Sequence, residues 1–201
     1  MLLTNRLNGA RLRLIALALT ASLALACGGR PFDVKPKPDV APSVSGPSAR
    51  LNGITIQAEA VTDEDFLNDT FDANLILAGI LPVQVMMKND AAQPVELKKA
   101  RFEITAAGNR KFKMLDARRA FKRLISFYEI STYSKDGYKK SEADFSSYAF
   151  DTGRPLGAGE SRTGMIFFMI AEDYARMPNL TLAVSRIGDE KNDSTVELKL
   201  N

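Results

Sequence analysis

Residues 53–61 read GITIQAEAV and residues 78–90 read AGILPVQVMMKND, and these two stretches are the strongest indication of the fold class. In the first, Ile54, Ile56 and Ala58 alternate with polar side chains, which is the period of a strand with one buried face. In the second, alternating apolar residues run into an Asn-Asp pair that is typical of a turn. Both stretches therefore predict half-buried strands.

The same spacing recurs further along the chain. The apolar residues Val95 and Leu97 occupy odd-numbered positions, whereas those at 100, 102 and 104 occupy even-numbered ones. Because a regular strand keeps its buried side chains at every second position, we expect a bulge or break near Lys98 and Lys99. Further strands are expected at 165–170, 180–184 and 196–200, and less regular candidates lie at 128–133 and 144–150.

Two segments have a different periodicity. Between Asp116 and Tyr128, Phe121 and Leu124 share an apolar stripe opposite a basic face, which predicts a helix with Asp116 as its N-cap. Residues 63–77 are expected to form a second, shorter helix or an ordered loop. With six to eight short strands between turn signals, the chain is predicted to be mainly β, an immunoglobulin-like antiparallel β-sandwich with one or two helical insertions.

The N-terminal region is typical of an export signal. Residues 1–13 carry three arginines and no acid, and residues 14–26 are apolar or small over a span too short to cross a membrane. The segment Leu23-Ala24-Leu25-Ala26-Cys27-Gly28 resembles the type II signal peptide and lipobox of bacterial lipoprotein precursors. This resemblance implies cleavage before Cys27 and acylation of Cys27. The alternative is an ordinary secretory peptide in which Cys27 is incidental.

Gly28 stands where that family's inner-membrane retention signal would place Asp, so the resemblance implies an outer-membrane anchor facing the periplasm. Residues 27–50 hold five of the nine prolines and predict a disordered linker. The boundaries expected are a signal peptide at 1–26, the linker at 27–50 and the β-sandwich domain at 51–201. Within this domain, residues 53–170 resemble a loosely defined group of bacterial lipoproteins with immunoglobulin-like domains of unassigned role, which carries over no catalytic residue.

Composition limits the chemistry of the chain. One Cys, no His and no Trp exclude a disulfide framework and any catalytic triad or zinc site that needs histidine. The net charge is +3, and removal of the three N-terminal arginines leaves none, so nucleic acid is not an expected partner. We expect no enzymatic activity and no cofactor. The alternative is a hydrolase of envelope polymers that uses paired carboxylates.

An acidic run in residues 59–72 has two interpretations. Its oxygen atoms are suitable calcium ligands, but the spacing does not fit an EF-hand loop, because position 70 is Thr and position 76 is Ile. A solvated acidic surface is the other interpretation, and we expect no metal site. The acids are Glu59, Asp63, Glu64, Asp65, Asp69 and Asp72.

A basic segment follows at residues 98–123, with ten Lys or Arg residues against Glu103 and Asp116. It can neutralise the acidic run within the fold, lie on an anionic envelope surface, or bind an acidic partner. A helix whose basic face is merely solvated is the alternative to all three. The candidate contact residues are Arg118, Arg119, Lys122 and Arg123.

These observations predict a membrane-anchored envelope lipoprotein. Its partners would be the lipid bilayer, through acylated Cys27, and a protein or anionic envelope surface bound by the β-sandwich. The domain would act as a binding or scaffolding module, and the lipid would fix its location.

Overall fold

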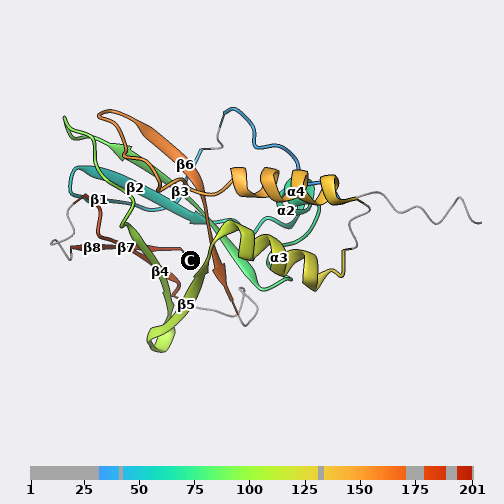
Figure 1. Cartoon of the computed structure of the whole chain (residues 1–201). Helices are drawn as coiled ribbons and strands as arrows, with labels where there is room; N and C mark the ends of the chain where they lie inside the picture. Colours follow the sequence, from blue (N-terminus) through green and yellow to red (C-terminus); the bar gives the residue numbers. More distant parts are fainter. Residues whose placement is uncertain (1–31, 41–42, 131–133, 171–178, 189–193, 201) are drawn as a thin grey trace, which may run out of the picture. The chain divides into compact units, whose positions relative to one another are not determined.

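The computed structural model describes residues 32–40, 43–130, 134–170, 179–188 and 194–200. Within them, eight antiparallel strands form a sheet in the order β1-β2-β3-β6-β5-β4-β7-β8 (Figure 1). The strands are β1 (Ser48–Leu51), β2 (Ile54–Ala60), β3 (Ile80–Asn89), β4 (Arg101–Ala106), β5 (Arg110–Leu115), β6 (Ser161–Met169), β7 (Thr181–Ser185) and β8 (Thr195–Lys199). The helices are α2 (Glu64–Phe71), α3 (Ala117–Phe127) and α4 (Lys135–Ser147), and a 3₁₀ turn, Ala107–Asn109, joins β4 to β5.

Strand β5 joins the two halves of the sheet. Its residues 110–112 pair with β4, and its residues 113–115 pair with β6. The half made of β1, β2, β3 and β6 and the half made of β4, β7 and β8 supply side chains to one common core. The outer strands β1 and β8 also contact each other, so the sheet is nearly closed into a barrel. The predicted class, mainly β with helical insertions, is confirmed.

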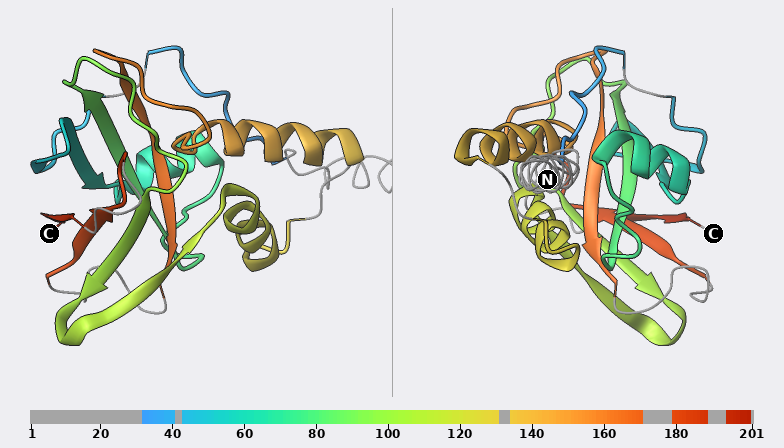
Figure 2. Two further views of the ribbon diagram at one scale, coloured as in Figure 1. Left: turned by 60° about the vertical axis from the view of Figure 1, so that its left-hand side comes forward. Right: turned by 90° about the vertical axis from the view of Figure 1, so that its right-hand side faces the viewer.

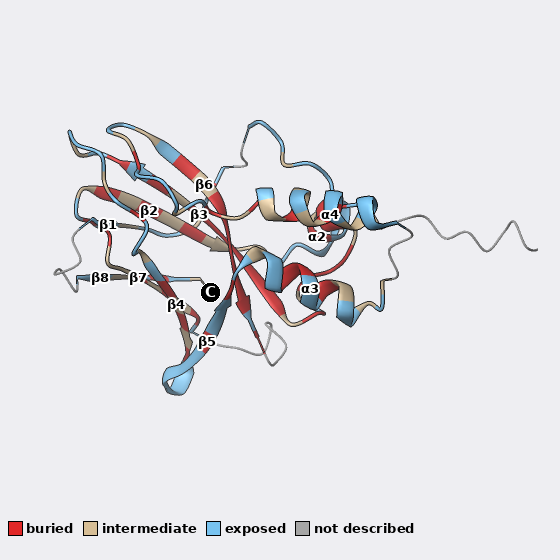
Figure 3. Cartoon of the chain, viewed as in Figure 1, coloured by how far each residue is buried: buried red, intermediate tan, exposed pale blue. Residues whose placement is uncertain are grey.

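Strand β6 separates two cores, because successive side chains of a strand point to opposite faces. Ile166 and Phe168 face the core between the halves of the sheet, which we call the sheet core. Met165 and Phe167 face the three helices, in what we call the helix core. The helices lie together on that side of the sheet (Figure 2), and buried residues run along β3 and β6 in the middle (Figure 3).

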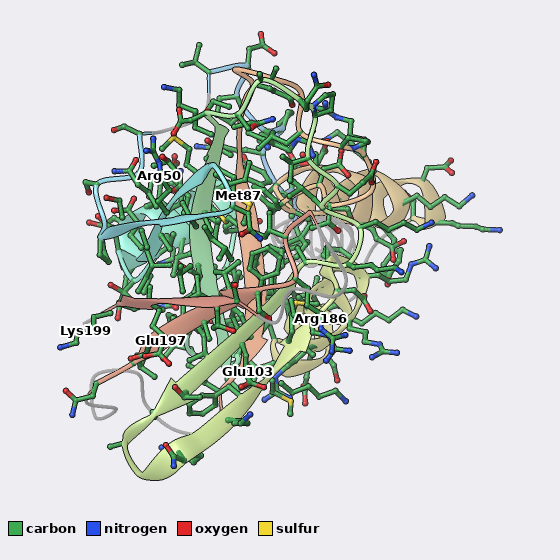
Figure 4. All side chains as sticks on the ribbon, turned by 90° about the vertical axis from the view of Figure 1, so that its left-hand side faces the viewer. Arg50, Met87, Glu103, Arg186, Glu197 and Lys199 are labelled. Atoms are coloured by element: carbon green, nitrogen blue, oxygen red, sulfur yellow. The ribbon has the colours of Figure 1, made fainter. Side chains whose placement is uncertain are left out.

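The outer strand of the second half shows the same alternation. In β8, Leu198 is buried between the exposed residues Glu197 and Lys199, whose side chains lie on the surface in Figure 4. Met87 of β3, labelled in the same view, is fully buried in the sheet core. Alternation in the sequence therefore predicted the face that enters the sheet core correctly in these strands. Strand β3 was expected to be half-buried, but residues 80–85 are buried on both faces, because the helices lie over the other face.

Both predicted helices are present. The carboxylate of Asp116 accepts a hydrogen bond from the Arg119 amide at 2.8 Å and caps α3. Asp63 caps α2 in the same way, through the Phe66 amide at 2.9 Å. Each carboxylate satisfies an amide that has no partner within its helix, which is why these helices begin where they do.

Two of the less regular strand predictions are wrong. Residues 144–147 belong to α4, and only the segment after it forms an isolated bridge, from Ala149 to Met165. Residues 128–130 follow the end of α3, and 131–133 lie outside the described residues. Strands β1 and β5 and helix α4 had not been predicted. The break expected near Lys98 and Lys99 is present, because β4 begins only at Arg101, but the alternating residues before it form no strand: Val95 makes an isolated bridge with Leu156.

The proline-rich segment differs from the extended linker that its composition suggested. Val34 is fully buried in the helix core, and Phe32 packs against the same core. The Lys35 amide donates to the Thr70 carbonyl at 2.9 Å, and the Lys35 ammonium pairs with Asp69. Packing of the domain therefore begins before Leu51, because the few apolar residues among the prolines find a buried site.

The predicted signal peptide and Cys27 lie outside the described residues. Among the helices that the structure does describe, none has the length and apolar composition needed to span a bilayer.

Candidate functional site

Helix α3 presents the predicted basic face to solvent. Phe121 and Leu124 are fully buried in the helix core, while Arg118, Arg119 and Lys122 are exposed on the other side of the helix. This division follows from the spacing of the apolar residues, which places them on one stripe of the helix. The helix therefore holds its cations on a rigid, outward-facing surface.

The four predicted contact residues are not equivalent. Arg118 pairs with Glu142 of α4 at 3.1 Å and Arg119 with Asp116 at 3.2 Å, yet their side chains remain 71% and 66% exposed. Lys122 is exposed and forms no ion pair within the described part of the chain. Exposed ion pairs of this kind are weak and leave much of the charge available to a partner.

Arg123 has a structural contact instead. Its Nε donates to the Ala78 carbonyl at 2.7 Å, and its guanidinium lies over Gly79, where a Cβ atom would come within 2.8 Å of Nη2. Arg123 thus fixes the loop between α2 and β3 against α3. Arg123 is exposed as well, so this bond does not remove it from the basic face of α3.

Large apolar side chains are exposed beside this basic face. Leu77 is 62% exposed and Phe127 is 52% exposed. A chain of contacts links them: the Phe127 ring packs edge-on against Tyr128 at 4.9 Å, and the Tyr128 hydroxyl donates to the Asn74 carbonyl at 2.9 Å. Asn74 in turn accepts a bond from the Leu77 amide. Leu77, Phe127 and the exposed cations of α3 form what we call the α3 surface.

The rest of the basic segment gathers elsewhere. Lys98, Lys99 and Arg101 line an open hollow of about 490 Å³ together with Arg186, which follows β7. Figure 4 shows Arg186 and Glu103 on this part of the surface. The cations of residues 98–123 are therefore spread over α3, this hollow and β5, where Lys111 pairs with Glu103, and they do not form one continuous basic face.

The acidic residues of 59–72 act mainly as local structural groups. Asp63 caps α2, Asp69 pairs with Lys35, and Glu59 accepts hydrogen bonds from the amide and hydroxyl of Ser45 at 3.1 and 2.8 Å. Across the described residues, no three Asp, Glu, Cys or His side chains are grouped as metal ligands would be. These carboxylates tie the N-terminal segment to α2 and β2.

A pocket that the sequence did not predict lies under the proline-rich segment. It has a volume of about 230 Å³ and is lined by Met165 of β6, Gln84 of β3, Phe66 of α2 and Tyr148. Residues 35–38 complete its wall. We call this space the strap pocket, because the segment crosses from α2 to β6 above it.

Two cations line the strap pocket: Lys35, which pairs with Asp69, and Lys37. The Nζ of Lys37 donates to the Thr163 carbonyl at 3.2 Å, and partial burial lowers the pKa of its ammonium. No carboxylate pairs with Lys37 within the described residues. The neighbouring Tyr148 hydroxyl donates to the Pro36 carbonyl at 3.1 Å, and burial raises its pKa. No periodicity or motif could have indicated Lys37, because its surroundings come from three distant segments.

Comparisons with known proteins add little. No family model matches the chain, and no curated protein matches it. Among solved structures, the chain is similar to a conserved hypothetical protein from Bacillus anthracis, with 9% identity and a TM-score of 0.37 over 79% of this chain and 94% of that one.

Proposed function

We propose that this protein is an envelope lipoprotein, anchored through acylated Cys27, whose domain binds an anionic surface through the α3 surface. The observation that carries the proposal is the juxtaposition of exposed cations on α3 with exposed Leu77 and Phe127. Side chains of these two kinds side by side are typical of contact with a lipid interface. The anchor confines the domain near the membrane, so weak contacts become effective.

Two features support surface binding over a merely solvated helix. Each basic residue close to an anionic membrane contributes about 1 kcal/mol, and α3 carries four exposed cations, one of which, Arg123, also bonds the Ala78 carbonyl. Exposed aromatic and aliphatic side chains beside them add apolar contact area. An acidic protein partner is the other source of such contacts, and the vesicle experiment below distinguishes it.

We also propose that the β domain is related to immunoglobulin-like sandwiches. The two halves of the sheet share one core, as the two sheets of a sandwich do. The continuous pairing through β5 is a difference from two separate sheets. An experimental structure in which β5 pairs with only one half would favour the sandwich, and pairing with both would favour a barrel.

Anchoring is tested by metabolic labelling with radioactive palmitate in a bacterial host. The wild-type chain should incorporate label and fractionate with membranes, whereas Cys27→Ala should do neither, because the thiol is the acylation site. Cys27→Ser is the matched control for loss of the thiol with retained polarity. Label that persists in either variant contradicts the proposal.

Surface binding is tested separately with the full chain carrying Cys27→Ser, so that no acyl chain contributes. Arg118→Glu with Lys122→Glu should weaken binding to mixed phosphatidylglycerol and phosphatidylcholine vesicles by at least about tenfold. Lys98→Glu with Lys199→Glu, which makes the same charge change away from α3, should have a smaller effect. An equal loss of vesicle affinity in the two variants would contradict binding through the α3 surface. If the parent chain bound no vesicles at all, membrane binding would be ruled out and an acidic protein would become the better candidate partner.

The hydrolase alternative has one specific location. Glu59 and Asp63 both line a hollow of about 320 Å³ between β2 and α2. Both carboxylates already accept hydrogen bonds, from Ser45 and from the Phe66 amide. If Glu59→Gln abolished the release of sugar from an envelope polymer, this alternative would replace the binding module.

A further inference from the structure

We propose that the strap pocket binds a single-chain apolar carboxylate, such as a medium-chain fatty acid, with its carboxylate on Lys37. The inference does not depend on acylation of Cys27 or on the α3 surface. It rests on three properties of the pocket: its lining, its unpaired cation and its size.

The lining is mostly apolar. Phe66 and Met165 line it, and Pro36 and Pro38 belong to the covering segment. Methionine and proline side chains offer apolar contact without demanding a hydrogen-bond partner. An alkyl chain therefore gains by leaving water for this space.

The cation selects the head group. A lysine ammonium has three donors, and among the described residues the Lys37 ammonium has a single hydrogen bond, to the Thr163 carbonyl. Partial burial without a carboxylate partner is costly for an ammonium, and a bound anion would offset that cost. One positive charge matches one carboxylate, whereas a phosphate dianion would require more donors.

The covering segment is held in place before any ligand arrives. Lys35 is tied to α2 through its amide and its ion pair with Asp69, and the Pro36 carbonyl accepts from the Tyr148 hydroxyl. A pre-formed site loses less conformational entropy on binding. The volume of about 230 Å³ equals that of roughly eight water molecules in the liquid, which suits a chain of about eight carbons.

Octanoate is the probe, and octanol is its uncharged counterpart. The full chain carrying Cys27→Ser is labelled with ¹³C at its methionine methyl groups and titrated with each compound. Octanoate should shift the Met165 methyl signal but not that of Met87, which lies in the sheet core. Octanoate should also bind about tenfold more tightly than octanol, because only the carboxylate meets the ammonium.

Lys37→Met removes the charge and keeps the apolar stem. It should lower octanoate affinity about tenfold and abolish the preference for octanoate over octanol. Lys37→Arg, which keeps a positive charge, should retain that preference. Lys111→Met, an exposed lysine on β5, is the matched control and should change neither. The proposal is overturned if octanoate leaves the Met165 signal unmoved at millimolar concentration, or if Lys37→Met retains the preference.

Discussion

Arg162 illustrates how a single residue can organise an irregular segment. Its side chain is almost fully buried at the start of β6, where Nη1 donates to the carbonyls of Asp151 and Arg154 at 2.7 and 3.0 Å. Nη2 donates to the Pro155 carbonyl at 2.7 Å and to the Glu160 carboxylate at 2.9 Å. Only the planar guanidinium has enough donors in a fixed fork to satisfy all four groups.

Replacing this guanidinium should destabilise the folded protein. Arg162→Lys keeps the charge but replaces a buried guanidinium that makes several part-buried hydrogen bonds with an ammonium that cannot reach all of these acceptors, so we expect a loss of about 2–4 kcal/mol in the free energy of unfolding, measured in urea. The control is Arg154→Lys, whose exposed side chain forms surface ion pairs with Asp151 and Glu160, with an expected loss of at most about 1 kcal/mol. Similar losses in the two variants would show that burial of Arg162 is not what matters.

Asp90 makes the stability of the protein depend on pH. Hydrogen bonds from the Thr55 hydroxyl at 2.6 Å and Arg50 at 2.8 Å, with Lys88 at 3.2 Å, hold the pKa of its carboxyl well below the usual range. Because the folded pKa is lower than the unfolded value of about 3.9, this stabilisation is present above pH 4 and is lost as the pH falls further.

Asp90→Asn should therefore be less stable than the wild type at neutral pH and lose less stability on acidification below about pH 4. Thermal unfolding followed by circular dichroism between pH 2 and pH 7 would measure how the stability of each protein changes with pH. Asp39→Asn, which replaces an exposed carboxylate, should leave this pH dependence unchanged. If the stability of Asp90→Asn fell with pH as steeply as that of the wild type, Asp90 would not be the source of the pH dependence.

At the scale of the elements, regular spacing was the reliable signal. Strand β2 and helix α3 were predictable because their own side chains divide into a buried and an exposed face. Strand β5 was not, because its burial repeats every third residue and its exposed positions are largely basic. Helix α4 buries only Ser141 and Phe145 and contains Gly137, so its sequence shows little amphipathic pattern.

The candidate sites divide in the same way. The cations of α3 could be predicted from spacing within one helix, since a single element places them. The strap pocket could not, because Lys37, Tyr148 and Met165 meet only through tertiary packing. Proline content suggested a linker, but Val34 and Phe32 determine where the segment lies.

The packed proline-rich segment leads to a prediction about stability. Val34→Ala should lower the free energy of unfolding by about 1–3 kcal/mol, because it removes fully buried apolar area. Val40→Ala makes the same change in the same segment at a side chain that is 84% exposed, and should have almost no effect. Urea unfolding of both variants measures the difference. Equal values would mean that residues 32–38 are only a linker.

At the scale of the whole molecule, the two cores are not independent. Strands β3 and β6 pair along nine residues, and their alternate side chains enter the sheet core and the helix core. Loss of either core would expose one face of both strands. The exposed α3 surface and the strap pocket both rest on the helix core, so their geometry depends on the central pair of strands.

This arrangement predicts that both cores unfold together. Phe168→Leu shortens a side chain of the sheet core and should destabilise the protein by about 1–2 kcal/mol. In ¹³C-methyl spectra recorded along a urea titration, the signals of Met87 in the sheet core and Met165 in the helix core should disappear at the same, lowered midpoint. Phe167→Leu, the neighbouring residue on the helix side, should act on both signals equally. If Phe168→Leu lowered the Met87 midpoint alone, the helices would be a separately stable layer, and ligand binding in the strap pocket would not protect the sheet.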